Sequence, residues 1–252
     1  MKSDGVAWGT LLAQYLGLLA GIGLIVYYHR NKFKYWSLKK MLDPLSLRAY
    51  FHVNRDIFLR TLILISSLSF FTAASSQFGS NILAINTLLF QFFLFFSYFI
   101  DGFANAAEAL VGKYISFKNS KELKLVTGQL MQWSFYISLG FSLLFFLFGK
   151  NILSILTNIP HLISEAQPYF IWVVLIPLLS FAAFIYDGIY VGATQAKAMR
   201  NSMFIASVLV YIPLYYLLRI PFGNHGLWIA FLSFLAVRGL ILFAWSKKYI
   251  FN

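Results

Sequence analysis

Residues 82–112 read ILAINTLLFQFFLFFSYFIDGFANAAEALVG, and the first nineteen of these residues carry no charge. An α-helix rises 1.5 Å per residue, so about 20 apolar residues cross the hydrocarbon core of a bilayer. Backbone N–H and C=O groups find no water in that core, and a helix satisfies them within one segment. The stretch therefore predicts a transmembrane α-helix with acidic residues, Asp101 and Glu108, only toward its end.

The rest of the chain has the same character. Of its 252 residues 60% are hydrophobic and 11% are charged, whereas soluble domains have roughly 45–50% and about 25%. This composition predicts an all-α integral membrane protein and excludes a soluble enzyme. The HExxH and GxSxG signatures are absent as well, so we expect no enzyme activity. About seven segments are long and apolar enough to span a membrane: Val6–Tyr28, Thr61–Gly79, Ile82–Gly112, Gly128–Gly149, Pro168–Thr194, Ser202–Leu218 and Gly226–Trp245.

The basic residues give an orientation. The chain carries 20 Lys and Arg residues against 8 Asp and Glu residues, a net charge of +12. In a soluble protein this balance would suggest nucleic acid, but here the cations lie between apolar runs. Sixteen of them fall on one alternating set of loops, which the positive-inside rule assigns to the cytoplasm. We therefore expect a multi-pass protein of the inner (plasma) membrane, with its N-terminus outside and its C-terminus cytoplasmic, in contact with the lipid bilayer and not with nucleic acid.

Two connecting segments are more than simple loops. Residues 34–51 mix aromatic and aliphatic side chains with cations, which predicts an amphipathic segment on the anionic inner leaflet. Residues 151–166 carry several isoleucines, which predicts a segment lying on the outer interface.

Three acids fall within the predicted spans. They are functional candidates because a carboxylate in a bilayer is costly. The chain has no Cys and only four scattered His residues, so we expect no metal site. Asp101, Asn105 and Glu108 are spaced i, i+4, i+7 and share one helix face, among small residues that allow another helix to approach. This face is either a polar path for a proton or cation or an interhelical hydrogen-bond staple. The nearby Lys113 favours the second interpretation for Glu108.

The third acid, Asp187, lies beside two tyrosines on a helix that contains Pro177, where a kink is expected. Together with Tyr186 and Tyr190 it could hold an organic cation through charge and cation–π attraction. The alternative is a buried ion pair with Arg238. Counted along their helices from the cytoplasmic ends, Asp101, Asp187 and Arg238 lie at similar depth, so Arg238 is predicted to pair with Asp101 or Asp187. The acid left without an arginine would be the better proton carrier.

Four stretches, in order along the chain, resemble the MATE (multidrug and toxic compound extrusion) family, most closely the branch that contains DNA-damage-inducible protein F. The most specific is DGFANAAEALVG, Asp101–Gly112, which resembles the signature of the eighth span. The others resemble the starts of the sixth and seventh spans and the tenth span with its following loop: Gly5–Thr10, Asn54–Thr61 and Asp187–Asn201.

The resemblance implies a twelve-span architecture of two six-helix bundles. Residues 1–28 would be the last helix of the first bundle, residues 29–53 a basic cytoplasmic linker with the amphipathic segment, and residues 54–252 the second six-helix bundle. The first five spans of the family would then be missing, so that a homodimer or a separate N-terminal bundle would have to supply the absent wall.

The resemblance also implies a function: cation-coupled antiport, with H⁺ or Na⁺ as the coupling ion and no other cofactor, for efflux of cationic amphipathic drugs or toxins. Asp187 and Asp101 would line the cavity of the second bundle. A non-transporting membrane fragment or assembly partner is the alternative. A lipid-linked-sugar flippase of the same superfamily is a lesser one, because its cavity would need several cations and Arg238 is the only one predicted within a span.

Overall fold

The computed structural model describes residues 3–29 and 43–251, which are helical apart from short turns and contain no strand. The chain divides into two units, Met1–Phe51 and His52–Asn252. The first unit contains helix α1 (Ser3–His29), whose apolar side chains between Trp8 and Tyr28 are almost all exposed. Gly17 and Gly21 lie four residues apart on this helix, and no atom of the described residues comes within 4 Å of a Cβ placed at either position.

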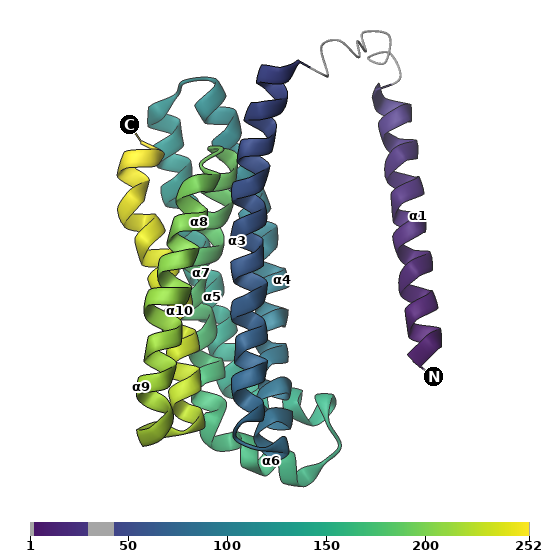
Figure 1. The fold of residues 1–252 in the computed structure, drawn as a ribbon, viewed down its shortest axis with the longest axis vertical. Coiled ribbons are helices and arrows are strands. Elements are labelled where there is room, and N and C mark those ends of the chain that lie inside the picture. The colour runs from purple at the N-terminus through teal and green to yellow at the C-terminus, as the bar shows by residue number, and fades with distance from the viewer. Residues whose placement is uncertain (1–2, 30–42, 252) are drawn as a thin grey trace. The chain divides into compact units, whose positions relative to one another are not determined.

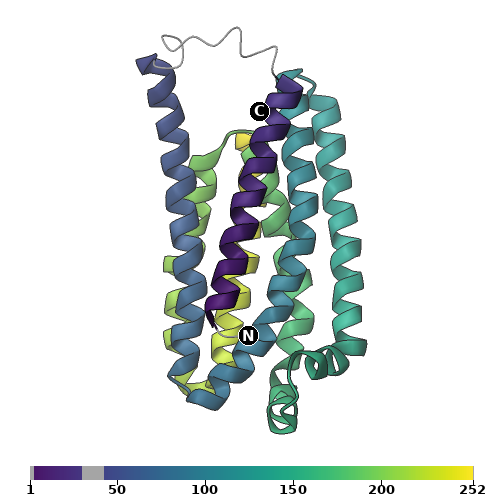
Figure 2. The same cartoon turned by 90° about the vertical axis from the view of Figure 1, so that its right-hand side faces the viewer.

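The second unit is a bundle of long helices, entered by α3, which begins in the first unit (Figures 1 and 2). Within the described residues seven helical segments are long and apolar enough to cross a membrane, which confirms the predicted number. The elements are α3 (Pro44–Ser76), α4 (Ser80–Ser116), α5 (Ser120–Leu156), α6 (Pro160–Ala166), the 3₁₀ turn η2 (Gln167–Tyr169), α7 (Phe170–Gly192), α8 (Ala196–Phe204), the π-helix η3 (Ile205–Tyr211), α9 (Ile212–Phe222) and α10 (Asn224–Tyr249).

Helix α7 is the centre of the bundle, since α4, α5 and α10 all pack against it. It approaches α4 backbone to backbone at two glycines one turn apart. A Cβ atom at Gly188 would lie 2.1 Å from the carbonyl oxygen of Ala104, and one at Gly192 would lie 2.4 Å from that of Glu108. Only glycine fits at either position, and this close approach brings the polar face of α4 beside α7.

The boundaries of the two predicted connecting segments, residues 34–51 and 151–166, differ from the prediction. Helix α3 begins at Pro44, so the last ten residues of the predicted linker, 44–53, are already helical. The first half of the predicted amphipathic segment, residues 34–42, lies outside the described residues. Residues 151–156 continue α5, so only α6 and its flanks remain of the predicted outer segment. Residues 45–53 and 151–156 contain no glycine and no proline, so nothing in them interrupts either helix.

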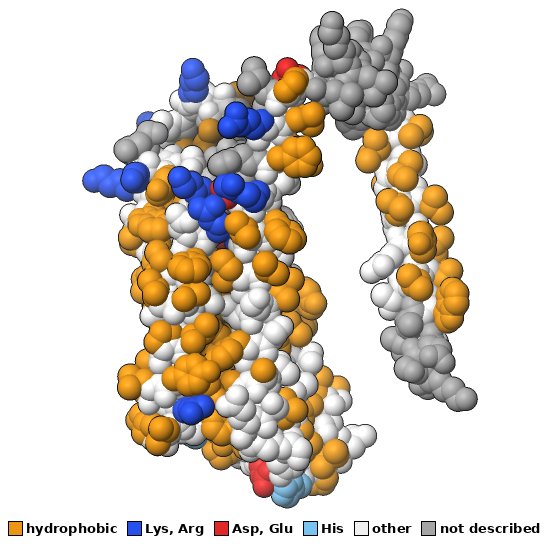
Figure 3. All heavy atoms as spheres, in the orientation of Figure 1, with side chains coloured by type: hydrophobic (Ala, Val, Ile, Leu, Met, Phe, Trp, Pro, Cys, Tyr) orange, Lys and Arg blue, Asp and Glu red, His pale blue; other side chains and the backbone are white. Residues whose placement is uncertain are grey.

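On the face drawn in Figure 3, most of the cations of the second unit gather at the end of the bundle where the C-terminus lies (Figures 1 and 3). The middle of the bundle shows mostly hydrophobic side chains on this face, as expected for a surface in contact with lipid.

Candidate functional site

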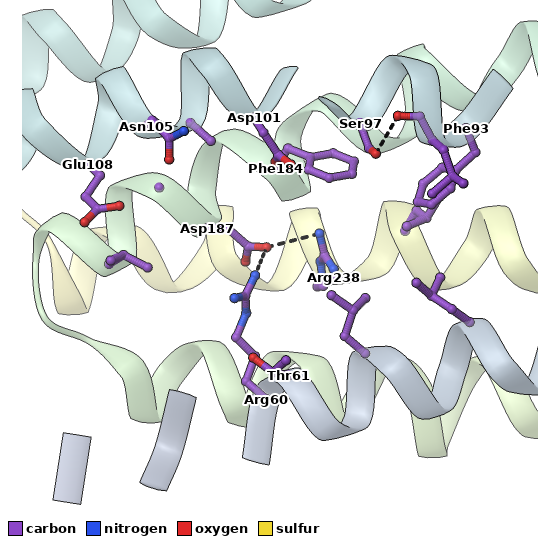
Figure 4. Close-up of a pocket in the computed structure, with 17 residues that line it drawn as sticks. Arg60, Thr61, Phe93, Ser97, Asp101, Asn105, Glu108, Phe184, Asp187 and Arg238 are labelled. Atoms are coloured by element: carbon purple, nitrogen blue, oxygen red, sulfur yellow. Dashed lines mark hydrogen bonds and ion pairs between the residues drawn. The ribbon is translucent and has the colours of Figure 1, made fainter. Parts of the chain in front are cut away.

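A cavity of about 500 Å³ lies between α3, α4, α7 and α10. Three acids and two cations face it, together with apolar and small residues (Figure 4). Its lining consists of Arg60, Thr61, Leu64, Leu68, Phe93, Leu94, Ser97, Asp101, Ala104, Asn105, Glu108, Phe184, Asp187, Gly188, Val191, Leu235 and Arg238.

Asp187 stands at the centre of the charged groups and binds two arginines. Nη2 of Arg238 lies 3.2 Å from Oδ2 of Asp187, and Nη2 of Arg60 donates a hydrogen bond to the same oxygen. Arg238 and Asp187 are buried, with 2% and 12% of their side chains exposed, and Arg60 is partly buried, with 18% exposed. The ion pair between Arg238 and one of the cavity acids is therefore present as the sequence predicts, and α3 supplies a second cation to it.

Arg60 was expected in the cytoplasmic loop, and Arg238 was expected to be the only cation within a span. Both expectations are wrong, because α3 is already helical at Arg60 and extends it into the cavity. The apolar run begins only at Thr61, so the hydropathy pattern assigned Arg60 to the flank of the span and not to its interior. Its spacing of four residues from Asp56 is the signal that could have placed both on one helix face.

Asp101, Asn105 and Glu108 lie along one side of α4 and line the cavity, as their spacing predicts (Figure 4). Unlike Asp187, none of the three makes an ion pair or a side-chain hydrogen bond with any residue that the structure describes. The interhelical hydrogen-bond staple is thus not formed among the described residues, and the α4 wall presents two carboxylates and an amide to the open side of the cavity.

The tyrosines do not flank Asp187 in the cavity, which corrects the proposed aromatic cation site. The hydroxyl of Tyr190 donates to the carbonyl of Leu242 at 2.8 Å, and the ring of Tyr186 packs 6.0 Å from that of Phe243. Positions 186 and 190 share a helix face that turns away from position 187 and toward α10. The aromatic ring beside the charges is Phe184, whose centroid lies 5.7 Å from the Arg238 guanidinium.

A second buried ion pair joins α3 to α8. Asp56 is 2% exposed, and its Oδ1 lies 2.5 Å from Nη1 of Arg200. Arg200 also donates from Nε and Nη2 to the Oδ1 atom of Asn201, at 3.2 and 2.9 Å. Asp56 precedes the predicted span Thr61–Gly79, so it was expected outside the membrane helices. Instead α3 carries an acid, Asp56, and a cation, Arg60, and each forms an ion pair with a residue of another helix.

At the opposite end of α3 the bundle is joined by a network of neutral polar groups. Asn86 and Asn224 exchange hydrogen bonds of 2.7 and 3.0 Å. Asn86 also donates to Ser75 at 2.8 Å and accepts from the indole of Trp228 at 3.0 Å. Every member is buried, so these bonds link α3, α4 and α10 where no water can replace them.

A bundle of membrane-length helices around a charged, partly open cavity is the architecture of polytopic transport proteins, where intramembrane charges mark the path of an ion or substrate. The chain belongs to the MatE family, whose sequence model matches residues 57–217.

Individual relatives agree with this assignment. The chain is 33% identical over 255 residues to DNA damage-inducible protein F of Escherichia coli (strain K12), an alignment that covers 99% of this chain and 54% of that protein. Among solved structures it is similar to "Crystal structure of MATE in the bent conformation", with a TM-score of 0.67, 18% identity, and coverage of 76% of this chain and 43% of that one. It is also similar to the inward-facing conformation of a multidrug resistance MATE family transporter of the MOP superfamily, with a TM-score of 0.66, 17% identity, and coverage of 82% and 49%. The chain spans about half the length of the curated relatives it matches.

Proposed function

We propose that the protein acts in secondary active transport, exporting cationic amphipathic compounds in exchange for H⁺ or Na⁺, and that it is not an enzyme. The observation that carries the proposal is the α4 wall: Asp101 and Glu108 line a cavity within the membrane region without a cation partner among the described residues. Unpaired carboxylates in such a place are costly unless they bind something that moves.

The arrangement divides the acids by role. Asp187 is held by two arginines, through ion pairs with Arg60 and Arg238. Asp101 and Glu108 are free to bind either a coupling cation or the cationic group of a substrate, but not both at once. Competition of this kind at a shared carboxylate is what couples two opposite fluxes, since release of one ion is required for binding of the other.

The setting of the protein follows from the same reasoning. We place the chain in the inner membrane, with the cation-rich end of the bundle in the cytoplasm and the N-terminus outside. The relatives it matches are about twice as long, and alternating access needs two walls around the site. The second wall would come from another copy of this chain or from a separate N-terminal bundle.

A lipid-linked-sugar flippase is the second candidate, and Arg60 favours it. The cavity contains two guanidiniums, Arg60 and Arg238, rather than one, and guanidinium groups suit the phosphates of such a lipid. Their engagement by Asp187 keeps cation export as the first proposal.

The test is transport by the purified full chain in liposomes. Ethidium movement is followed under an imposed pH gradient or an imposed Na⁺ gradient, for the chain alone and after co-reconstitution with the N-terminal half of the Escherichia coli relative. Asp101→Asn and Glu108→Gln should each lower the rate at least tenfold. Glu122→Gln, which changes an acid at the start of α5 outside the cavity, is the matched control and should leave it unchanged.

Three other results would count against the proposal. Absence of ethidium movement under both gradients, with and without the added half, would favour a non-transporting fragment or assembly partner. Equal loss in Glu122→Gln would show that the acids act on folding and not on transport. Movement of a lipid-linked phosphate without movement of ethidium would favour the flippase.

A further inference from the structure

Asp187 is the one carboxylate among the described residues that contacts the two arginines of the cavity, and the guanidiniums of Arg60 and Arg238 both reach its Oδ2 atom. Asp101 acts on both arginines electrostatically but makes no ion pair or hydrogen bond with either of them. Two guanidiniums therefore share a single contacting carboxylate, and a buried guanidinium is costly unless acceptors meet its donors.

The two arginines also have more donors than acceptors. A guanidinium carries five N–H groups and no acceptor. The Nε atoms of Arg60 and Arg238 are both buried and have no hydrogen-bond partner among the described residues. Within the same part of the chain, the acceptors of Arg238 are Asp187 and the weak sulfur acceptor of Met203, at 3.8 Å from Nη1. Arg238 is 98% buried, so its donors are shielded from the surface.

We infer that Arg60 and Arg238 form a binding site for an anionic group, a carboxylate, sulfonate or phosphate, carried either by an amphiphilic compound or by a lipid headgroup. The planar guanidinium binds oxyanions through paired N–H donors, and charge-assisted bonds of this type are the strong ones. The apolar part of the ligand would lie along Leu64, Leu68 and Phe93, which line the same cavity. The inference rests on the proposed function only for the use of this cavity, and it concerns binding, not export.

The surrounding charges fix how the site responds to pH. The acids that face it are Asp101 and Glu108 on α4 and Asp187 on α7, and the cations are Arg60 on α3 and Arg238 on α10. Protonation of any of the three acids removes a negative charge from the cavity. Binding of an anion should therefore strengthen as the pH falls, whereas binding of a cation at the same acids should weaken.

The experiment compares two probes of equal chain length and permanent charge, octanesulfonate and octyltrimethylammonium. Their binding to the full chain in phosphatidylcholine nanodiscs is measured by calorimetry, with empty nanodiscs as the blank. Arg60→Gln should weaken octanesulfonate binding about tenfold or more, because it removes a charged hydrogen-bond donor. Arg219→Gln is the matched control at a position outside the cavity and should change neither probe.

Asp187→Asn gives the sharper comparison. It removes the anion that competes for the two guanidiniums, so octanesulfonate should bind several-fold more tightly while octyltrimethylammonium binds more weakly. If Arg60→Gln does not yield folded protein, judged by its melting curve, Arg60→Lys takes its place. That variant keeps the charge but loses the paired donors, and it should weaken octanesulfonate binding by a smaller factor.

Nanodiscs that contain phosphatidylglycerol distinguish the two sources of the anion. Retention of this lipid by the purified chain in native mass spectrometry, lost in Arg60→Gln, would support the site with a lipid headgroup as its ligand. Binding of octanesulfonate without lipid retention would support a free amphiphile. The inference is overturned if neither ligand binds, or if Asp187→Asn weakens octanesulfonate binding. Failure of ethidium transport would leave these outcomes unaffected.

Discussion

Substitution of Gly188 by alanine tests whether the contact between α4 and α7 builds the site. A Cβ atom there would lie 2.1 Å from the Ala104 carbonyl oxygen, about 1.3 Å short of the 3.4 Å at which ordinary contact begins. The three nearest atoms all belong to the Ala104 backbone, so no side-chain rotation can relieve the overlap. The two helices must separate by roughly 1 Å, in a contact that has no slack.

The cost can be estimated from overpacking in other proteins. Forcing an extra methyl into a close-packed interface costs about 1–3 kcal/mol, and alanine returns up to about 1 kcal/mol through its better helix propensity. We expect Gly188→Ala to lower the free energy of unfolding by about 1–2 kcal/mol. A chain of this size should then melt several degrees lower, at roughly 2–4 °C per kcal/mol.

The assay is thermal unfolding of purified variants in detergent, followed by loss of the monodisperse peak in size-exclusion chromatography. Gly102→Ala is the matched control. Gly102 lies on α4 directly after Asp101, and no described atom lies within 4 Å of its Cβ position. It should melt at or slightly above the wild-type temperature. If Gly188→Ala melts with the wild type, α4 and α7 do not touch as described and the cavity geometry fails with them.

Two further predictions concern the polar contacts that join α3 to other helices, namely the Asn86 network and the ion pair between Asp56 and Arg200. Asn86→Leu should lower the melting temperature by an amount that corresponds to about 2–4 kcal/mol, because it removes the partner of several buried groups, Asn224 among them. Asp56→Asn should cost about 3 kcal/mol or more, because it leaves the Arg200 guanidinium without its carboxylate.

The controls follow from the contacts. Asn81→Leu changes an exposed asparagine on the same helix and should have a much smaller effect than Asn86→Leu. The double variant of Asp56→Asn with Arg200→Gln should be more stable than the sum of the two single changes predicts. Simple additivity would show that the two side chains do not interact, and equal effects at positions 81 and 86 would show that the network contributes little.

The number of spans and their approximate positions could be predicted because they depend on composition alone. A run such as residues 82–112 has to be a helix in a bilayer whatever it packs against. The pairing of Arg238 with Asp187 was predictable for a related reason: depth in the membrane follows from counting residues, and a buried cation needs a counter-ion.

The faces of the helices could not be predicted in the same way. Tyr186 and Tyr190 stand one and three residues from Asp187, and only the position of α10 decides that their rings turn away from it. Arg60 was assigned to a loop because the apolar run stops at this first charged residue, although the helix continues through it. Neutral residues such as Asn86 show no pattern in the sequence, since an asparagine links helices only where other helices, here α3 and α10, bring hydrogen-bond partners to it.

The shared carboxylate of Asp187 has a consequence for how the chain enters the membrane during synthesis. Its span and that of Arg238 are the two most apolar of the seven. A central charge opposes insertion by roughly 2.5–3.5 kcal/mol, and on the order of six leucine-like residues offset it. Each of these helices can thus partition into lipid by itself. The order of the residues along the chain sets the order in which the charges can pair. Arg60 is synthesised before Asp187, and Arg238 is synthesised after it. The carboxylate of Asp187 therefore has one counter-ion, Arg60, before the second is made.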